Sequence, residues 1–130
     1  MTVVNPPGLA APRGFSHGVI GQGRVLFVAG QIGWNADGVM AAGGFVEQFD
    51  RALANVLVVV LAAGGSPESI GRLTIFVVDK DEYTAARGAV GARYRERMGN
   101  HYPAMTLVEV RSLLEPGAKV EIEAVAVTPR

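Results

Sequence analysis

One C-terminal stretch, residues 102–127, constrains the fold more than any other part of the chain. Its sequence, YPAMTLVEVRSLLEPGAKVEIEAVAV, contains two alternating runs rich in β-branched residues, 105–110 and 119–127. A loop with proline and glycine separates the two runs, and this pattern predicts two β-strands. Both strands must belong to a sheet, so the rest of the chain has to provide their partners and their cover.

The second run presents two different faces of this sheet. Val120 and Ile122 fall on one face, and Glu121 and Glu123 fall on the other, because successive strand side chains point to opposite sides. The acidic face becomes apolar again at Val125, so neither face has the polar pattern of a sheet that is covered on one side only. We therefore expect a second protein surface to cover the remaining apolar face.

The composition predicts one domain over residues 1–130. The 12 basic residues balance the 12 acidic ones, so no basic surplus neutralises phosphates and nucleic-acid binding is disfavoured. The chain has no cysteine, which excludes disulfides and thiolate metal ligands. No apolar run approaches the roughly 20 residues of a membrane span, and the N-terminus lacks a signal-peptide pattern. We expect a cytoplasmic protein with no membrane partner.

The first half of the chain predicts an irregular start, a hairpin and a helix. Residues 1–13 are rich in proline and predict an irregular lead-in. Residues 18–20 and 24–29 flank the tight turn GQG, which predicts a β-hairpin. Hydrophobic residues then recur every three or four positions from Phe45 to Leu61, and two glycines follow soon after, which predicts a helix that ends there.

The second half predicts a strand, a second helix and the two strands described above. Residues 73–78 form the apolar strand, and Asp81 is a suitable cap for a helix that ends at Gly99. The resulting order, β-β-α-β-α-β-β, is typical of an α+β domain with two helices on one face of a sheet. The opposite face is then the apolar surface that a homo-oligomer would bury.

Short motifs along residues 14–127 follow one another in a characteristic order and spacing. They are LFVAGQIG at 26–33, Gln48 and Asn55 in the first predicted helix, AAGG at 62–65, YPA at 102–104 and VEIEA at 120–124. Each motif alone is weak, but together they cover nearly the whole chain. In this order they resemble the RidA proteins, also called the YjgF/YER057c/UK114 family.

The resemblance implies a fold, an assembly and an activity. The fold is chorismate-mutase-like, with a mixed sheet and two helices on one face, and the assembly is a homotrimer with small-molecule clefts between its subunits. The best-known chemistry of the family is hydrolysis of 2-imino or enamino acids to 2-oxo acids and ammonia. Some members are instead described as ribonucleases or translation inhibitors.

Several site positions depart from the pattern that the resemblance implies. The family has a carboxylate-binding arginine where this chain has Met105, and a thioether does not replace that planar donor. The same pattern has tyrosine at Phe15, serine at Ala29 and asparagine at Arg87. Glu121 keeps the position of the glutamate that holds or activates water. We expect a deaminase of altered specificity or, alternatively, a non-catalytic ligand-binding trimer, with a ribonuclease as the least favoured hypothesis.

Each candidate residue also has a structural interpretation. Glu121 could act as a general base or order a water beside a C=N carbon, or it could be an interface carboxylate paired with an arginine. Arg87 could enter the cleft and replace the missing anchor, but a solvent-exposed helix arginine is the more ordinary state. Met105 and Leu107 would make the cleft wall apolar, although packing at an interface is the more common role. Gly30 belongs to the same predicted site.

No metal or cofactor motif accompanies these residues. His17 and His101 are the only histidines, and they lack the spacing of metal ligands. No phosphate-binding loop and no local serine–histidine–acid set is present, so we expect neither a metal nor a cofactor. Arg13 and Arg111 are further candidate cations. The predicted partners are a small-molecule ligand and further copies of the chain.

Overall fold

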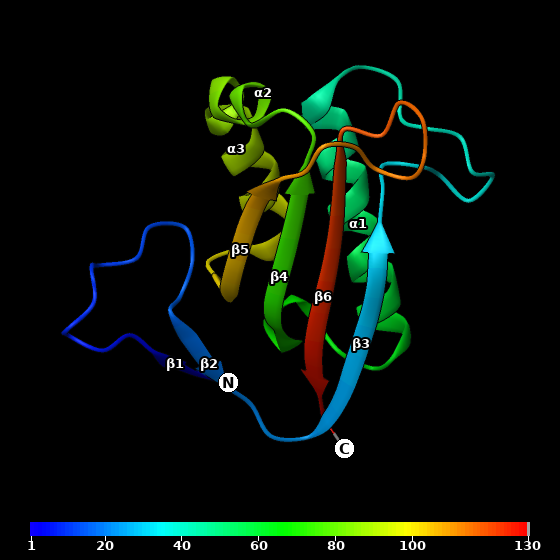
Figure 1. Ribbon diagram of the computed structural model, residues 1–130. Coiled ribbons are helices and arrows are strands. Elements are labelled where there is room, and N and C mark those ends of the chain that lie inside the picture. Colours follow the sequence, from blue (N-terminus) through cyan, green and yellow to red (C-terminus); the bar gives the residue numbers. More distant parts are fainter. Residues whose placement is uncertain (130) are drawn as a thin grey trace.

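A mixed four-stranded sheet organises the molecule (Figure 1). The computed structural model describes residues 1–129. The strands lie in the order β3 (Arg24–Gln31), β6 (Val120–Thr128), β4 (Ile70–Val77) and β5 (Ala104–Glu109). β6 runs antiparallel to both of its neighbours, whereas β4 and β5 are parallel. The two C-terminal strands of the sequence are therefore not adjacent, because β4 lies between them.

The long helices α1 (Phe45–Ala62) and α3 (Arg87–Met98) lie on the same face of this sheet (Figure 1). At the start of α1 the Glu47 carboxylate accepts the Gly44 N–H at 3.0 Å, and this bond lowers the pKa of Glu47. A short helix α2 (Lys80–Ala85) precedes α3, and a 3₁₀ turn η1 (Pro67–Ser69) precedes β4. Within residues 1–129, no helix is both long and apolar enough to cross a membrane.

The strand register decides which side chains face the helices. Leu73 pairs with Ala124 on β6 and with Met105 on β5, so these three side chains share the helix face. The buried core lies between this face and α1. Its fully buried members include Ala52, Val56, Val60, Ile70, Leu73, Val77, Val120, Ile122 and Ala126.

The other side of the sheet, which we call the open face, carries apolar side chains with no cover. Phe27 is 78% exposed and Val25 is 57% exposed on β3, and Val108 is 40% exposed on β5. Phe76 pairs with Glu121 and with Val108, which places the candidate glutamate in the same row of this face. The apolar second face that the sequence predicts is therefore present.

The predicted β-hairpin over residues 18–29 is wrong. Instead, β2 (Gly18–Ile20) pairs with β1 (Thr2–Val4) in a separate small sheet, and β3 pairs with β6. The physical reason lies in Ser16, whose N–H donates to the Pro103 carbonyl at 3.0 Å and whose hydroxyl donates to the Tyr102 carbonyl. These bonds hold the chain before β2 at the β5 edge, while β3 occupies the opposite edge.

Two further expectations about the elements need correction. The lead-in over residues 1–13 is not wholly irregular, because Thr2–Val4 forms β1. The second predicted helix divides at Ala86 into α2 and α3, and its cap is Asp79 rather than Asp81. The Asp79 side chain accepts the N–H groups of Asp81 and Glu82, which leaves Asp81 inside the first turn. The predicted α1 and the four other strands agree with the structure within a few residues.

Candidate functional site

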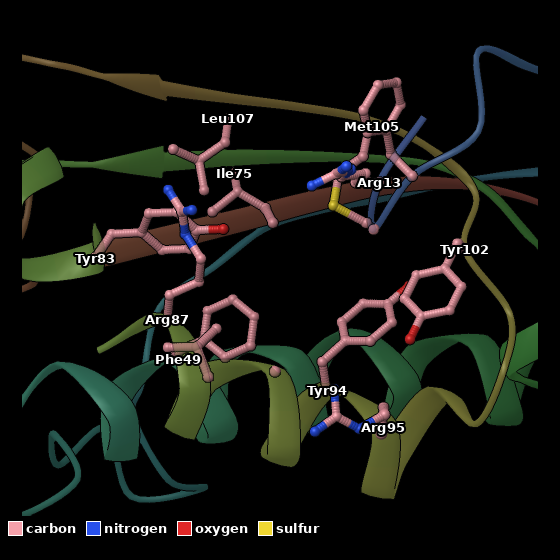
Figure 2. Close-up of a pocket in the computed structure, with 14 residues that line it drawn as sticks. Arg13, Phe49, Ile75, Tyr83, Arg87, Tyr94, Arg95, Tyr102, Met105 and Leu107 are labelled. Carbon is pink, nitrogen blue, oxygen red and sulfur yellow. The ribbon is translucent and has the colours of Figure 1, made fainter. Parts of the chain in front are cut away.

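A cavity of about 890 Å³ separates α3 from the β5 side of the sheet. Figure 2 shows its two main walls: Ile75, Met105 and Leu107 project from the sheet, and residues of α1 and α3 face them across the gap. Fourteen residues line the cavity, and they come from residues 13–15, from β4, from β5 and the loop before it, and from all three α-helices. They are Arg13, Gly14, Phe15, Phe49, Ile75, Tyr83, Arg87, Val90, Gly91, Tyr94, Arg95, Tyr102, Met105 and Leu107.

The cavity exists because α3 is anchored to α1 as well as to the edge of the core. Asp50 on α1 accepts the Arg97 Nε–H at 2.6 Å and the Arg93 Nη1–H at 3.0 Å. The hydrogen bond from Arg97 holds the pKa of the Asp50 carboxyl below its ordinary value. Val90 and Met98 on the same helix are buried. This anchorage keeps α3 beside α1 and leaves the strip of sheet next to it uncovered.

Aromatic rings lie at both ends of the cavity, with Tyr94 and Tyr102 at one end and Tyr83 at the other (Figure 2). Tyr94 and Tyr102 stack with ring centroids 5.3 Å apart, and the Tyr94 hydroxyl donates to the His101 carbonyl at 2.7 Å. Burial raises the pKa of Tyr94, so this phenol stays protonated. Tyr83 on α2 packs edge-on against Phe45, with ring centroids 6.2 Å apart. The rings provide flat apolar surfaces that suit a planar or aliphatic ligand.

Three arginines provide the charge of the cavity. Figure 2 shows Arg87 extending from α3 across the gap towards Leu107, and Arg13 entering at the Met105 end. Arg95 lies along α3, where its Nη1 would be 3.3 Å from a Cβ at Gly91. The fourteen lining residues include no aspartate or glutamate. The cavity is therefore positively charged and suits an anion.

Glu121 belongs to a second group of candidate residues, on the open face. A Cβ at Gly30 would lie 2.8 Å from Glu121 Cδ, so a side chain at this position would displace the carboxylate from the place it occupies beside the glycine. Ala29 precedes Gly30 where the pairing of β3 with β6 shifts register between Val28 and Gln31. This irregularity lets the β3 backbone lie directly beside the glutamate.

A buried glutamine fixes the start of the strand that carries Glu121. Gln48 on α1 is 5% exposed, its Nε2–H donates to the Gly117 carbonyl at 3.0 Å, and its Oε1 accepts the Lys119 N–H at 2.8 Å. Both ends of the amide are therefore used in holding the loop before β6. The position of Glu121 on the strand depends on this contact with α1.

The structure divides the predicted site residues into two groups. It brings Phe15, Arg87, Met105 and Leu107 together around the cavity. It places Ala29, Gly30 and Glu121 on the open face, and none of these three lines the cavity. Arg13, which the sequence offered as a further candidate cation, also lines the cavity, whereas the other lining residues were not predicted as site residues. Their signal was hidden, because Tyr83, Val90 and Tyr94 fit the apolar stripe of a helix that packs in a core.

The histidines and Arg111 lie outside this arrangement. A ring nitrogen of His17 contacts the Ala10 carbonyl at 2.6 Å, and one of His101 contacts the Ile70 carbonyl at 2.6 Å. Arg111 does not line the cavity. Residues 1–129 contain no group of three or more histidine, aspartate or glutamate side chains that could hold a metal ion.

Known proteins match the chain over nearly its full length. The family model described as endoribonuclease L-PSP matches residues 7–128. A 2-iminobutanoate/2-iminopropanoate deaminase of Capra hircus is 30% identical over 80% of this chain and 73% of its own length. The Rid family protein YyfB of Yersinia pestis, of unknown function, superposes with a TM-score of 0.85 at 34% identity and 97% coverage of both chains. The E. coli TdcF structure with bound serine gives a TM-score of 0.70 at 29% identity and 98% coverage of both.

Proposed function

The chain belongs to the Rid family, which the endoribonuclease L-PSP model describes, and from this premise we propose that it hydrolyses imines or enamines with an altered specificity. The reaction takes place in a cleft between two copies of a homotrimer. The relatives named 2-iminobutanoate/2-iminopropanoate deaminase support this class of reaction. This reaction needs no metal or cofactor, because water is the only co-reactant of an imine hydrolysis.

One observation carries the proposal: the predicted site residues lie on opposite faces of the same sheet. Within one copy, Glu121 on the open face cannot reach a ligand in the cavity, because the sheet lies between them. The open face is also apolar, with Phe27 78% exposed. A neighbouring copy that covers this face would bring Glu121 of one copy to the cavity mouth of the next. A repeated contact of this head-to-tail kind forms a closed trimer when each copy is rotated by a third of a turn from the last.

In this arrangement the two groups of residues have separate roles. The cavity binds the organic part and the acidic group of the substrate. Glu121 accepts a proton from a water molecule while the water oxygen attacks the C=N carbon. The resulting tetrahedral centre expels ammonia once its nitrogen has been protonated, and a carbonyl group remains. Gly30 leaves the space in which the Glu121 carboxylate lies.

Met105 is the basis for an altered specificity. On the sheet wall of the cavity it supplies a thioether, which offers a substrate carboxylate no hydrogen-bond donor. We expect slow hydrolysis of 2-iminopropanoate and 2-iminobutanoate, and faster hydrolysis by Met105→Arg, because the new guanidinium binds the carboxylate of these small substrates. Met105→Leu is the matched control and should stay slow.

Ammonia release tests the activity. An amino-acid oxidase generates the imines in situ, and ammonia is measured with and without the protein, with Glu121→Gln as the variant that lacks the general base. We expect a rate above background for the wild type and a loss of about 100-fold or more in Glu121→Gln. No rate above background with a panel of imines, in both the wild type and Met105→Arg, would refute the proposal.

The assembly is tested separately by the mass of the protein in solution. Three copies are expected from light scattering, because a monomer would leave Phe27 and Val25 in water. Phe27→Glu should shift the mass towards that of a monomer, since it places a charge in the proposed interface. A monomeric mass for the wild type would contradict the trimer and, with it, the assembled cleft.

A ligand-binding trimer without catalysis is the second candidate, because Glu121 is remote from the cavity within a single copy. It predicts thermal stabilisation by a ligand without turnover, worth about 2.7 kcal/mol at 100 times the Kd. A ribonuclease activity is least favoured, since the 12 basic and 12 acidic residues balance. If the freshly purified protein cleaved RNA and Glu121→Gln did not, ribonuclease activity would become the favoured function.

A further inference from the structure

Two of the three arginines that line the cavity enter it from opposite ends. Arg13 comes from the lead-in and lies at the Met105 end, whereas Arg87 comes from α3 and extends to the Leu107 end (Figure 2). Met105 and Leu107 are two residues apart on β5, which corresponds to about 7 Å along a strand. The cavity therefore offers two separate guanidinium groups along one wall.

Neither guanidinium has a carboxylate partner in the described part of the chain. The ion pairs of residues 1–129 join Arg93 and Arg97 to Asp50, and Lys119 to Glu82. Arg13 and Arg87 take part in none of them. Because no acidic residue lines the cavity, an incoming anion meets no competing carboxylate there and can accept two parallel N–H bonds from each arginine.

The wall between the two arginines is apolar. Ile75, Met105 and Leu107 project from the sheet, and Phe49 and Val90 face them from the helices. A polar group placed against these five side chains would lose its hydration without gaining a partner from them. The ligand should therefore carry its charges at its two ends and have methylene or aromatic carbon between them.

The size of the cavity also favours a ligand larger than a three- or four-carbon acid. Its volume is about 890 Å³, near the upper end of the roughly 300–1,000 Å³ that is typical of sites for drug-sized ligands. A neighbouring copy across the mouth would fill part of this space. The length available along β5 between Arg13 and Arg87 remains, because both arginines belong to the same copy.

We propose that the cavity selects dicarboxylates, with one carboxylate at Arg13 above Met105 and the other at Arg87. The spacing suits an extended diacid of about five or six carbons, whose ends each need room for a guanidinium contact. This inference deepens the proposed function: if the protein is a deaminase, its substrate class is the imine of an acidic amino acid. Binding of an unreactive diacid does not depend on that activity.

Calorimetric titration with glutarate and butyrate tests this selection, because neither acid can react. The wild type should bind glutarate at least 10-fold more tightly than butyrate in a low-salt buffer without phosphate. Arg13→Gln and Arg87→Gln should each lower the affinity for glutarate at least 10-fold and leave butyrate, which needs only one arginine, much less affected. Arg51→Gln is the matched control, since Arg51 is exposed on α1 and does not line the cavity.

Three results of this titration would overturn the inference. Equal affinity for the two acids, no binding of glutarate at millimolar concentration, or unchanged binding in both variants would each reject it. Arg13 and Arg87 are exposed, so their replacement should leave the thermal unfolding transition in place. If glutarate is selected but no imine is hydrolysed, the proposed activity fails and the ligand class stands. If imines are hydrolysed without a preference for diacids, the ligand class fails and the activity stands.

Discussion

The two long helices on the same face of the sheet differ in what they cover. α1 packs directly on the sheet, and its residues Ala52, Val56 and Val60 have no exposed surface. α3 is joined to α1 by Asp50 and stands away from β5, with a cavity of about 890 Å³ beneath it. One helix therefore closes its half of the core, and the other leaves a cavity over its half.

The sequences of the two helices explain this difference. α1 is rich in valine, leucine and alanine on the face towards the sheet, so close packing of that face is favourable. α3 contains four arginines and two glycines in 12 residues, and its buried residues are Val90, Tyr94 and Met98. A helix of this composition gains stability from its contacts with α1 rather than from broad burial against strands. We infer that stability and ligand binding are located in different halves of the same layer.

The largest expected effect comes from replacing a leucine by alanine, once in the α1 half of the molecule and once in the α3 half. Leu53→Ala on α1 should lower the free energy of unfolding by about 2–5 kcal/mol, because this side chain is 1% exposed and leaves a void. Leu107→Ala should cost only about 1 kcal/mol, since its side chain already borders the cavity. Urea denaturation of both variants measures the difference. Equal losses would mean that the β5 half is as tightly packed as the α1 half.

An intermediate effect is expected from the link between the helices. Asp50→Asn should lower the free energy of unfolding by about 1–2 kcal/mol, because Arg93 and Arg97 lose a partly buried, charged acceptor. Glu96→Gln on the exposed side of α3 is the matched control and should change stability little. A loss in the control equal to that of Asp50→Asn would show that the link between the helices contributes nothing specific.

The contact of Asp50 with Arg93 and Arg97 also makes the free energy of unfolding depend on pH. The pKa of Asp50 is lowered in the folded protein from its ordinary value of 3.8, so its stabilising contribution is complete above that value and is lost as the pH falls through the lowered pKa. Wild-type stability should therefore fall more steeply below about pH 4 than that of Asp50→Asn. Parallel acid titrations of the two proteins, followed by circular dichroism, measure this difference.

The smallest expected effect has the opposite sign. Gly88→Ala on α3 should raise the free energy of unfolding by about 0.5–1 kcal/mol, because a Cβ there meets nothing within 4 Å and alanine favours the helix. Gly91→Ala should gain less, since its Cβ would lie 3.3 Å from Arg95 Nη1 and that arginine would have to move. Thermal unfolding compares the two variants. A loss in Gly88→Ala would mean that α3 is packed more closely than the cavity implies.

The regular elements could be predicted from the sequence because their patterns are local. The three- and four-residue period of α1 and the alternation in β6 each determine a face by themselves. The partner of β2 could not be predicted, because it depends on Ser16 bonding to the distant residues Tyr102 and Pro103. The short-range turn at residues 21–23 suggested a hairpin that this long-range anchor prevents.

The candidate site could be predicted only in part, for a similar reason. The resemblance pointed to Phe15, Arg87 and Met105, and strand alternation added Leu107; the structure places all four around one cavity. It pointed equally to Glu121, which alternation alone puts on the face opposite to Ile122. What the sequence could not provide is the position of α3 relative to the sheet. That position depends on the contact between Asp50 and the arginines of α3. It creates the space that Arg13 and Arg87 enter from opposite ends.

The most direct test of a site shared between copies mixes two variants that are damaged on opposite faces. Arg87→Glu repels the acidic ligand from the cavity and Glu121→Gln removes the base, so each protein alone should release almost no ammonia from the imine that the wild type hydrolyses fastest. Refolding the two together at equal amounts should restore about one quarter of the wild-type rate, because random assembly joins an intact cavity to an intact Glu121 in that share of the sites. A mixture no more active than its two components would mean that no site is shared between copies, and it would contradict the account.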